Sequence, residues 1–467
     1  MSYKLKLLPI ILVGWMTAAS SAVNIDNRDV LSGYSSLLSL FREVSIEAPR
    51  LQAIRARTSS AQEKQSEAFG ALLPQISAQG SYNKNRQHAE NFPSQAYDGQ
   101  SYILSLNQVI YNRSTWQNYQ KYKLLARQKI FEAQDAESEI AADLAERYFK
   151  ALASEDQLAL VQAEWRATNK NYDRVKALYS RQLATITDRL EIEARLDTLV
   201  AAEIDAKNQI KVTRENLSEL VGRSVLEPLE RINQKDPFIF DLRSISYWAD
   251  KAMVSSPALA AKQKAQESVE AAIREAQGGH LPTVSLSLNA QNTNLGYQNT
   301  QSPKTDTLYA GVNVQIPIFS GGSTSARVRG LMDELDASEY ETDEIRKRIK
   351  KEVSTAVLNA DSGLGKIKAT RQALYSSHKA RLATEKSFEY QTKNTVDVLD
   401  SIREEYSARR DYLQAQYNYF MSIVTLYRWS GRLSDAELSQ LSAWLTADER
   451  SLNVELDDRV PTRTDSE

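Results

Sequence analysis

Four short segments of the chain alternate between apolar and polar side chains: 75–83, 102–110, 283–291 and 308–318. In the third of them, valine, leucine and alanine occupy one set of positions, whereas the other set carries only serine, threonine, asparagine and glutamine. A period of two residues places the two kinds of side chain on opposite faces of a β-strand. The pattern therefore predicts four strands, each with one apolar face and one polar face.

Polar loops at 84–99 and 291–306 join the predicted strands into two hairpins. Each strand has about nine or ten residues, the length that a tilted strand needs to cross a bilayer. A soluble sheet with one face on a protein core also fits any one of these strands alone. The polar faces, however, resemble the lining of a water-filled lumen. Four strands cannot close a barrel, and lipid does not tolerate an open sheet edge, so several chains are expected to share one barrel.

Long helices follow the two hairpins. Neither glycine nor proline occurs between residues 100 and 221, and the residues that fill this stretch favour helix. The pattern predicts a long helix at 114–179, roughly 100 Å in length at 1.5 Å per residue, and a second at 323–390. Gly363 and Gly365 interrupt the second long helix at a cost of about 1 kcal/mol each relative to alanine, which favours a bend there. Returning helices are predicted at 187–221 and 396–429, and shorter helices precede each hairpin.

The second half of the chain repeats the first after about 208 residues. Pro49-Arg50-Leu51 recurs as Pro257-Ala258-Leu259, and Leu73-Pro74 recurs as Leu281-Pro282. A solenoid repeat is roughly 20 to 50 residues, so this period indicates one duplicated structural module. We therefore expect an α+β fold with an internal two-fold repeat, divided into a first repeat at 23–222, an equatorial connector at 223–256, a second repeat at 257–431, and a C-terminal segment with a polar tail at 432–467.

The N-terminus has the features of an export signal. Lys4 and Lys6 precede the apolar run 7–16, and small residues at 20–22 suit a signal peptidase, so cleavage is expected after Ala22. The run has about ten apolar residues, whereas a membrane-spanning helix needs about 20. The absence of cysteine excludes disulfides, thiolate metal sites and acylation of an N-terminal cysteine. The formal net charge of −2 predicts no affinity for nucleic acid.

The sequence offers little support for an enzyme. The three histidines, His88, His280 and His378, fall in a predicted loop, a strand entry and a long helix. This scatter suggests neither a metal site nor a catalytic triad, and each histidine is expected to be a surface or junction residue. No cofactor is expected.

Several segments are similar to a known family: ALLPQISAQGSYN, GGHLPTVSLSLNA, IPIFSGG, LATITD, TVDVLD and AQYNYF. Together they resemble the TolC family of outer-membrane efflux and type I secretion channels, from about residue 28 to residue 445. The resemblance implies a homotrimer, whose three chains of four strands form a 12-strand barrel in the outer membrane. It also implies a 12-helix tunnel that extends through the periplasm.

The resemblance assigns roles to the turns at 180–187 and 391–395, which lie roughly 100 Å from the strands by helix length. In the family these turns form a periplasmic aperture, and Asp397 and Asp400 match two aspartates that ring it. Their i,i+3 spacing places both carboxylates on one helix face. Three copies would bring six acids together, attract cations and raise some of their pKa values. The residues alone favour a capping role for Asp397, as for Asp188, since acids stabilise the first turn of a helix.

The family also holds its closed state with links between helix pairs. Thr187, Asp188 and Tyr390 match three linking positions, and Lys393 stands where the family has an arginine. Lysine cannot form the bidentate fork of arginine, so a weaker or rearranged latch is expected. Both turns lack the glycine common in the family. The expected contacts with a periplasmic adaptor are Gln182, Leu183 and Asn394.

The chain has no nucleotide-binding loop, so export would depend on partners. The resemblance implies a periplasmic adaptor and an inner-membrane ABC or proton-driven transporter, with outer-membrane lipid around the strands. Opening would be a rigid-body shift of the returning helices. A trimeric coiled-coil envelope scaffold or adhesin without a pore is the alternative, although it would not need polar strand faces. The sequence does not separate protein cargo from drug cargo.

Overall fold

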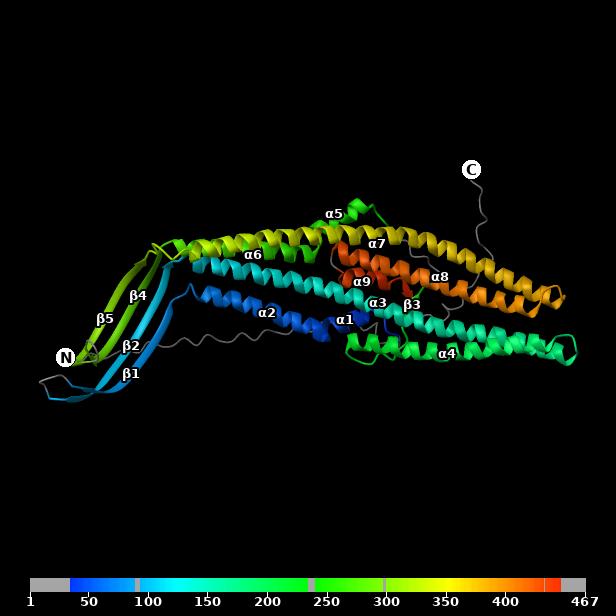
Figure 1. Ribbon diagram of the computed structural model, residues 1–467, viewed down its shortest axis with the longest axis horizontal. Helices are drawn as coiled ribbons and strands as arrows, with labels where there is room; N and C mark the ends of the chain where they lie inside the picture. The colour runs from blue at the N-terminus through cyan, green and yellow to red at the C-terminus, as the bar shows by residue number, and fades with distance from the viewer. Residues whose placement is uncertain (1–33, 89–92, 234–239, 297–299, 432, 447–467) are drawn as a thin grey trace.

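The computed structural model describes residues 34–88, 93–233, 240–296, 300–431 and 433–446, and these form an elongated molecule with strands at one end and helices along the rest (Figure 1). The expected signal segment 1–22 and the polar tail beyond residue 446 lie outside the described residues. None of the described helices combines the length and the apolar character needed to span a membrane.

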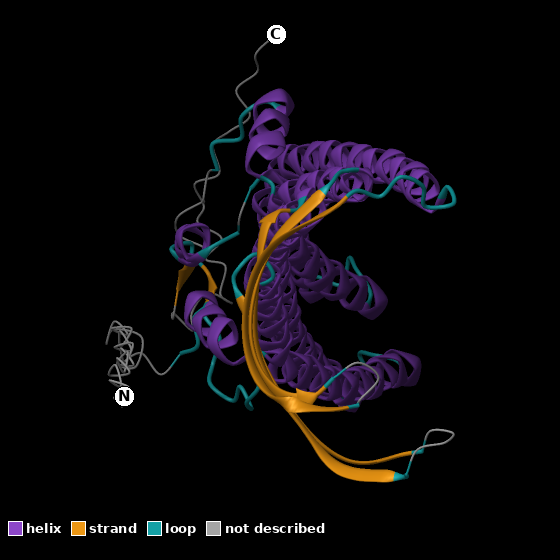
Figure 2. Cartoon of the chain, turned by 90° about the vertical axis from the view of Figure 1, so that its left-hand side faces the viewer, coloured by secondary structure: helices purple, strands orange, loops and turns teal. Residues whose placement is uncertain are grey.

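The strands form one antiparallel sheet in the order β1-β2-β4-β5. Their bounds are β1 Gln75–Gln87, β2 Gln95–Tyr111, β4 Thr283–Leu295 and β5 Gln301–Gln315. Pairing of β2 with β4, for example Leu106 opposite Leu288, merges the two hairpins into a single sheet. Figure 2 shows that this sheet is strongly curved. Within the described chain, β1 and β5 are its two edges.

The strands are longer than the sequence predicts. Much of the expected loops 84–99 and 291–306 is strand, as in the pairing of Asn85 with Tyr97. Ladder pairing uses backbone groups and needs no apolar face, so the period-two pattern marks only part of each strand. At its other end β5 stops at Gln315 rather than at the predicted residue 318, because Pro317 has no N–H to donate.

The apolar face of the sheet is bare. Leu308, Val312 and Val314 on β5 are 85%, 61% and 60% exposed. A soluble sheet would bury such a face against a protein core. The soluble alternative considered for a single strand therefore does not fit the described chain.

Two long helices and the helices beside them form the shaft of the molecule. The first hairpin lies between α2 Pro49–Gly70 and α3 Arg113–Ser180, and α4 Ile186–Val221 returns along α3. The same order follows with α6 Pro257–Gln277, the second hairpin, α7 Ser323–Glu389 and α8 Thr395–Ser430. The long and returning helices differ by at most one residue at each end from the helices that the sequence predicts. Figure 1 shows α2 and α4 following each other along α3, and α6 and α8 along α7.

Short elements gather beside the middle of the shaft: α1 Leu37–Glu47, α5 Ile245–Ser255, α9 Asp435–Ser442, and β3 Arg231–Ile232 paired with β6 Leu445–Thr446. Apolar residues of α1, α9, β3 and β6 join those of α3 and α8 in one core, whereas Trp248 and Ala252 of α5 pack in a second cluster with α7. Tyr148 of α3 is fully buried in this core and donates a hydrogen bond to the carbonyl of Glu230 at 2.9 Å. The core therefore fastens the connecting segments to the shaft, away from both ends.

Candidate functional site

The two helix hairpins reverse through matching turns at the end of the molecule far from the sheet (Figure 1). In each turn a glutamine has left-handed backbone, with φ of 62° at Gln182 and 57° at Gln391. This conformation costs a residue with a side chain roughly 1–2 kcal/mol. The two glutamines thus take a backbone conformation that favours glycine, a residue that neither turn contains. No sequence pattern marks a left-handed glutamine, so this feature was not predicted.

The returning helices begin with the same capping box. At the start of α4, the backbone N–H of Asp188 donates to Thr185 Oγ1 at 3.1 Å, and that of Thr185 donates to Asp188 Oδ2 at 2.9 Å. At the start of α8, the corresponding bonds between Asp397 and Asn394 are 2.8 Å and 3.1 Å. Both aspartates therefore cap their helices, as the residues alone predict.

Hydrogen bonds and charge stabilise the ionised form of both capping aspartates. The hydrogen bond from the backbone N–H of Asn394 has the largest effect on the pKa of Asp397 and, together with the Lys393 ammonium, lowers it although desolvation opposes them. Partial burial acts to raise the pKa of Asp188, but hydrogen bonds from Thr185 and from the Thr395 side chain outweigh it and leave the pKa low. A raised pKa in a ring of acids would need several chains and stays a prediction.

Each of the two expected aperture acids forms an ion pair with a basic side chain of the same chain. Asp397 Oδ1 lies 3.3 Å from Lys393 Nζ, and Asp400 Oδ1 lies 3.2 Å from Arg403 Nη2. About half of the Asp400 side chain, 52%, is exposed. The first pair joins the turn to the first turn of α8 and the second runs along α8, and both leave the carboxylates near the surface. Among the described residues, no cluster of three or more histidine, aspartate or glutamate side chains could hold a metal ion.

The four expected gate residues are not joined to one another. Across the described ranges, no hydrogen bond or ion pair connects any two of Thr187, Asp188, Tyr390 and Lys393. Lys393 binds Asp397 instead, and Tyr390 is 80% exposed. Their role as links within one chain therefore has no support in the structure.

Two other contacts cross between the hairpins near the turns. Arg174 of α3 donates from Nη2 to Glu389 Oε1 of α7 at 2.8 Å. The side chain of Thr395, only 2% exposed at the start of α8, lies close enough to Asp188 at the start of α4 to help lower the pKa of that carboxyl. Sequence reasoning missed both contacts, because their partners lie more than two hundred residues apart and share no local pattern.

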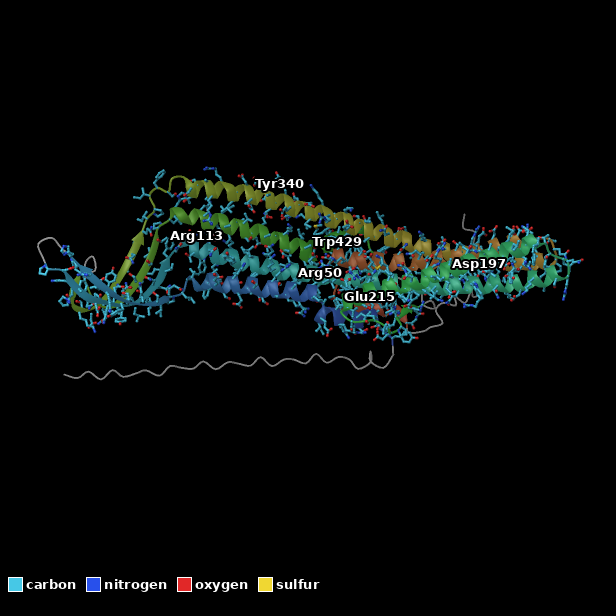
Figure 3. All side chains as sticks on the ribbon, turned by 60° about the horizontal axis from the view of Figure 1, so that its bottom comes forward. Arg50, Arg113, Asp197, Glu215, Tyr340 and Trp429 are labelled. Atoms are coloured by element: carbon cyan, nitrogen blue, oxygen red, sulfur yellow. The ribbon has the colours of Figure 1, made fainter. Side chains whose placement is uncertain are left out.

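The expected adaptor contacts lie at the tips. Gln182 and Leu183 are exposed in the first turn, and 59% of Leu183 is accessible. Asn394 is also exposed, but its side chain caps α8. Figure 3 shows side chains along the whole shaft, with Arg113 at the junction to the strands and Asp197 on α4 toward the turns. The tips thus present a small mixed surface rather than an enclosed pocket.

Comparison with known proteins identifies this architecture. The model of the outer membrane efflux protein family matches residues 40–223 and again residues 248–432. The chain belongs to this family. It is similar to outer membrane protein TolC of Vibrio cholerae, with 27% identity over 94% of this chain and 98% of TolC. It is also similar to the protease secretion protein PrtF of Dickeya chrysanthemi, with 26% identity over 85% of this chain and 88% of PrtF.

Solved structures of outer-membrane proteins share the fold. The CmeC outer membrane channel of Campylobacter jejuni gives a TM-score of 0.76 at 13% identity and covers 94% of this chain and 98% of its own. The outer membrane protein VceC of Vibrio cholerae gives 0.74 at 17% identity, covering 85% of this chain and 96% of its own. The predicted resemblance to the TolC family is therefore confirmed. The protein lies in the outer membrane and extends into the periplasm, and its relatives are channel proteins rather than enzymes.

Proposed function

We propose that the protein is the outer-membrane exit duct of a type I secretion or efflux system, formed by three copies of the chain. The observation that carries this proposal is the curved sheet with a bare apolar face and two edge strands. In lipid, an unpaired edge leaves backbone groups without hydrogen bonds and costs several kcal/mol for each group. Pairing β1 of one copy with β5 of the next satisfies both edges.

Three such sheets give a barrel of 12 strands, since each chain supplies four. The polar faces of the strands then line the lumen and the apolar faces meet lipid. Each chain also supplies four helical columns, namely α3, α7, α2 with α4, and α6 with α8, so three chains give a tunnel of 12 columns. The 68 residues of α3 make this tunnel roughly 100 Å long, enough to extend far into the periplasm.

The repeated order of elements supports a duplicated module. We assign residues 23–222 and 257–431 to the two copies, with 223–256 as the equatorial connector, 432–467 as the C-terminal segment, and 1–22 as a signal peptide. The core around Tyr148 holds the connector against α3 and supports its role as a belt around the shaft.

The tips of the helices form the gate in this proposal. Asp397 and Asp400 of three chains make a ring of six acids that favours cations. Within each chain the closed state is held by the pairs Arg174–Glu389 and Asp188–Thr395, which cross between the hairpins. The exposed Tyr390, together with Thr187 and Lys393, is available for links to the neighbouring chain.

Partners supply energy and choose the cargo. A periplasmic adaptor binds the tips at Gln182, Leu183 and Asn394, and an inner-membrane ABC or proton-driven transporter drives export. PrtF of Dickeya chrysanthemi and AprF of Pseudomonas aeruginosa are both named for protease secretion, and CmeC is described as an outer membrane channel. The relatives thus leave both protein and small-molecule cargo open for this chain.

The test is single-channel recording of the purified protein in planar bilayers. We expect a small, cation-selective conductance that loses its selectivity in the variant Asp397→Ala with Asp400→Ala. The matched control is Asp343→Ala with Glu344→Ala, because these exposed acids also pair with arginines one turn away but lie far up α7. Absence of conductance from a correctly folded assembly would refute the duct and favour a scaffold.

A further inference from the structure

A buried ion cluster joins α7 to α8 above the turns. Glu405 of α8 has a side chain only 1% exposed. Its Oε1 lies 3.1 Å from His378 Nδ1 of α7 and accepts from Arg409 Nη2 of α8 at 3.1 Å. Its Oε2 accepts from Arg381 Nε of α7, and Arg381 also binds Glu385. His378 was expected to be a surface or junction residue, whereas the structure places it against this carboxylate.

Buried apolar residues lie near the cluster on both helices. Leu374 of α7 and Val398 and Ile402 of α8 are at most 1% exposed. Burial acts to raise the pKa of Glu405, but the bonds from Arg381 and His378 keep it below its usual value. Replacing a buried ion cluster with apolar residues of similar volume is often neutral or stabilising. Stability alone therefore does not explain why the Glu405 cluster is present. Buried polar groups in helix pairs have a better attested effect, which is to fix register.

The position of Glu405 on α8 relates it to the proposed aperture acids. At 3.6 residues per turn, Asp400 points about 140° away from Glu405 around the helix, and Asp397 about 80° away. Holding Glu405 against α7 therefore turns Asp400 away from α7. A rotation of α8 by one residue position, about 100°, would point both carboxylates in a different direction relative to α7.

An open groove of about 520 Å³ runs along α7 and α8 farther from the turns, lined by residues that include Asn359, Gly363, Lys366, Asn418 and Tyr419. At its floor the two helices approach closely, since a Cβ at position 363 would lie 3.1 Å from the Tyr419 ring. The bonds of Glu405 to His378 and Arg381 add a directional restraint between the two helices closer to the tips.

We propose that the Glu405 cluster is a positioning device that fixes the register and rotation of α8 against α7, and so aims Asp400 away from α7 and Asp397 to its side. The aiming of the two acids rests on the proposed aperture, whereas the control of register does not. Glu405 is thus a positioning residue, because it acts through α8 and does not face the path of the cargo.

The test compares two variants with a matched control in the full-length protein. Arg381→Met, Glu405→Leu and Arg409→Met together remove the cluster but keep its volume, and Glu405→Gln keeps its shape without the charge. The control, Arg346→Met, Glu344→Leu and Arg348→Met, makes the same kinds of substitution among exposed pairs on α7. Thermal unfolding is expected to place the triple variant within a few degrees of the unaltered protein, since apolar replacement is close to neutral.

Register is measured by a disulfide in a chain that has no cysteine of its own. A Cβ at position 363 would lie 3.4 Å from Tyr419 Cβ, close to the separation in disulfides, so Gly363→Cys with Tyr419→Cys reports the native register. We expect both cluster variants to lower the oxidation yield at least about threefold, because register is no longer specified, and the control to leave it unchanged.

Cation selectivity in planar bilayers is the second readout and should fall in both cluster variants but not in the control. Unchanged disulfide yield and selectivity in both variants would overturn the proposal. So would a triple variant that fails to fold, because the cluster would then act through stability. Absence of conductance from the unaltered protein would instead refute the duct, and the disulfide yield would still decide the role of Glu405 in register.

Discussion

Arg174 and Glu389 form a 2.8 Å ion pair that joins α3 to α7 close to the turns. Their side chains are 38% and 54% exposed, so the pair is worth about 0–1 kcal/mol in each chain. In the proposed trimer the energies of three such pairs would add around one aperture. A small total of this kind suits a gate that has to open. The pair links the two hairpins close to their tips.

Removing this pair should favour the open state. We expect Glu389→Gln to raise the frequency of large conductance events in bilayers, and the exchange Arg174→Glu with Glu389→Arg to restore the original behaviour. The exchange Glu146→Lys with Lys150→Glu is the control, because this pair lies within α3. Equal effects of Glu389→Gln and of the control would show that charge near the shaft matters, and not the link between hairpins.

The left-handed glutamines should be replaceable by glycine without loss. Glycine adopts positive φ without steric cost, so Gln182→Gly and Gln391→Gly should each change stability by less than about 1 kcal/mol, with a gain expected. Gln372→Gly, in the interior of α7, should instead lose about 1 kcal/mol. Urea unfolding of the assembled protein measures all three. A loss at position 182 as large as that at 372 would contradict the strain argument.

The caps of α4 and α8 should weaken in acid. The pKa values of Asp188 and Asp397 are lowered in the folded chain, so their contribution to stability is present above the unfolded value, near 3.9, and is lost as the pH falls through the folded value. Asp397→Asn should therefore lower the melting temperature at pH 7, and this difference should shrink as the pH falls below the unfolded pKa near 3.9. A difference that persists unchanged at pH 3 would assign the effect to packing instead of ionisation.

A charged residue on the exposed apolar face of β5 should destabilise the protein. Val312→Arg places a cation on the lipid side and should destabilise the folded protein by about 2–4 kcal/mol if the residue lies near the middle of the bilayer. Asn313→Arg, on the polar face of the same strand, should be tolerated better despite losing its bond to Ser287. Unfolding from lipid vesicles in urea provides the comparison. Similar losses at both positions would argue against lipid contact at Val312.

The sequence by itself determined the elements that depend on local properties. The period of two marks the apolar face of each strand, and the lack of glycine and proline between residues 100 and 221 predicts α3 and α4 to within one residue at each end. The capping roles of Asp188 and Asp397 also follow locally, because a cap bonds to backbone only three residues away. The family motifs added the outer membrane and the channel class.

Only the tertiary structure decided how distant segments meet. Glu405 and His378 are partners because α7 packs against α8, and Arg174 and Glu389 are partners because the ends of α3 and α7 come together near the turns. Lys393 matched a linking arginine in sequence, yet it binds Asp397, whose carboxylate lies four residues on, in the first turn of α8. The strand ends depend on ladder pairing, and the left-handed glutamines depend on the closure of each turn. These features arise from burial and from contacts across the chain, which no local pattern of residues encodes.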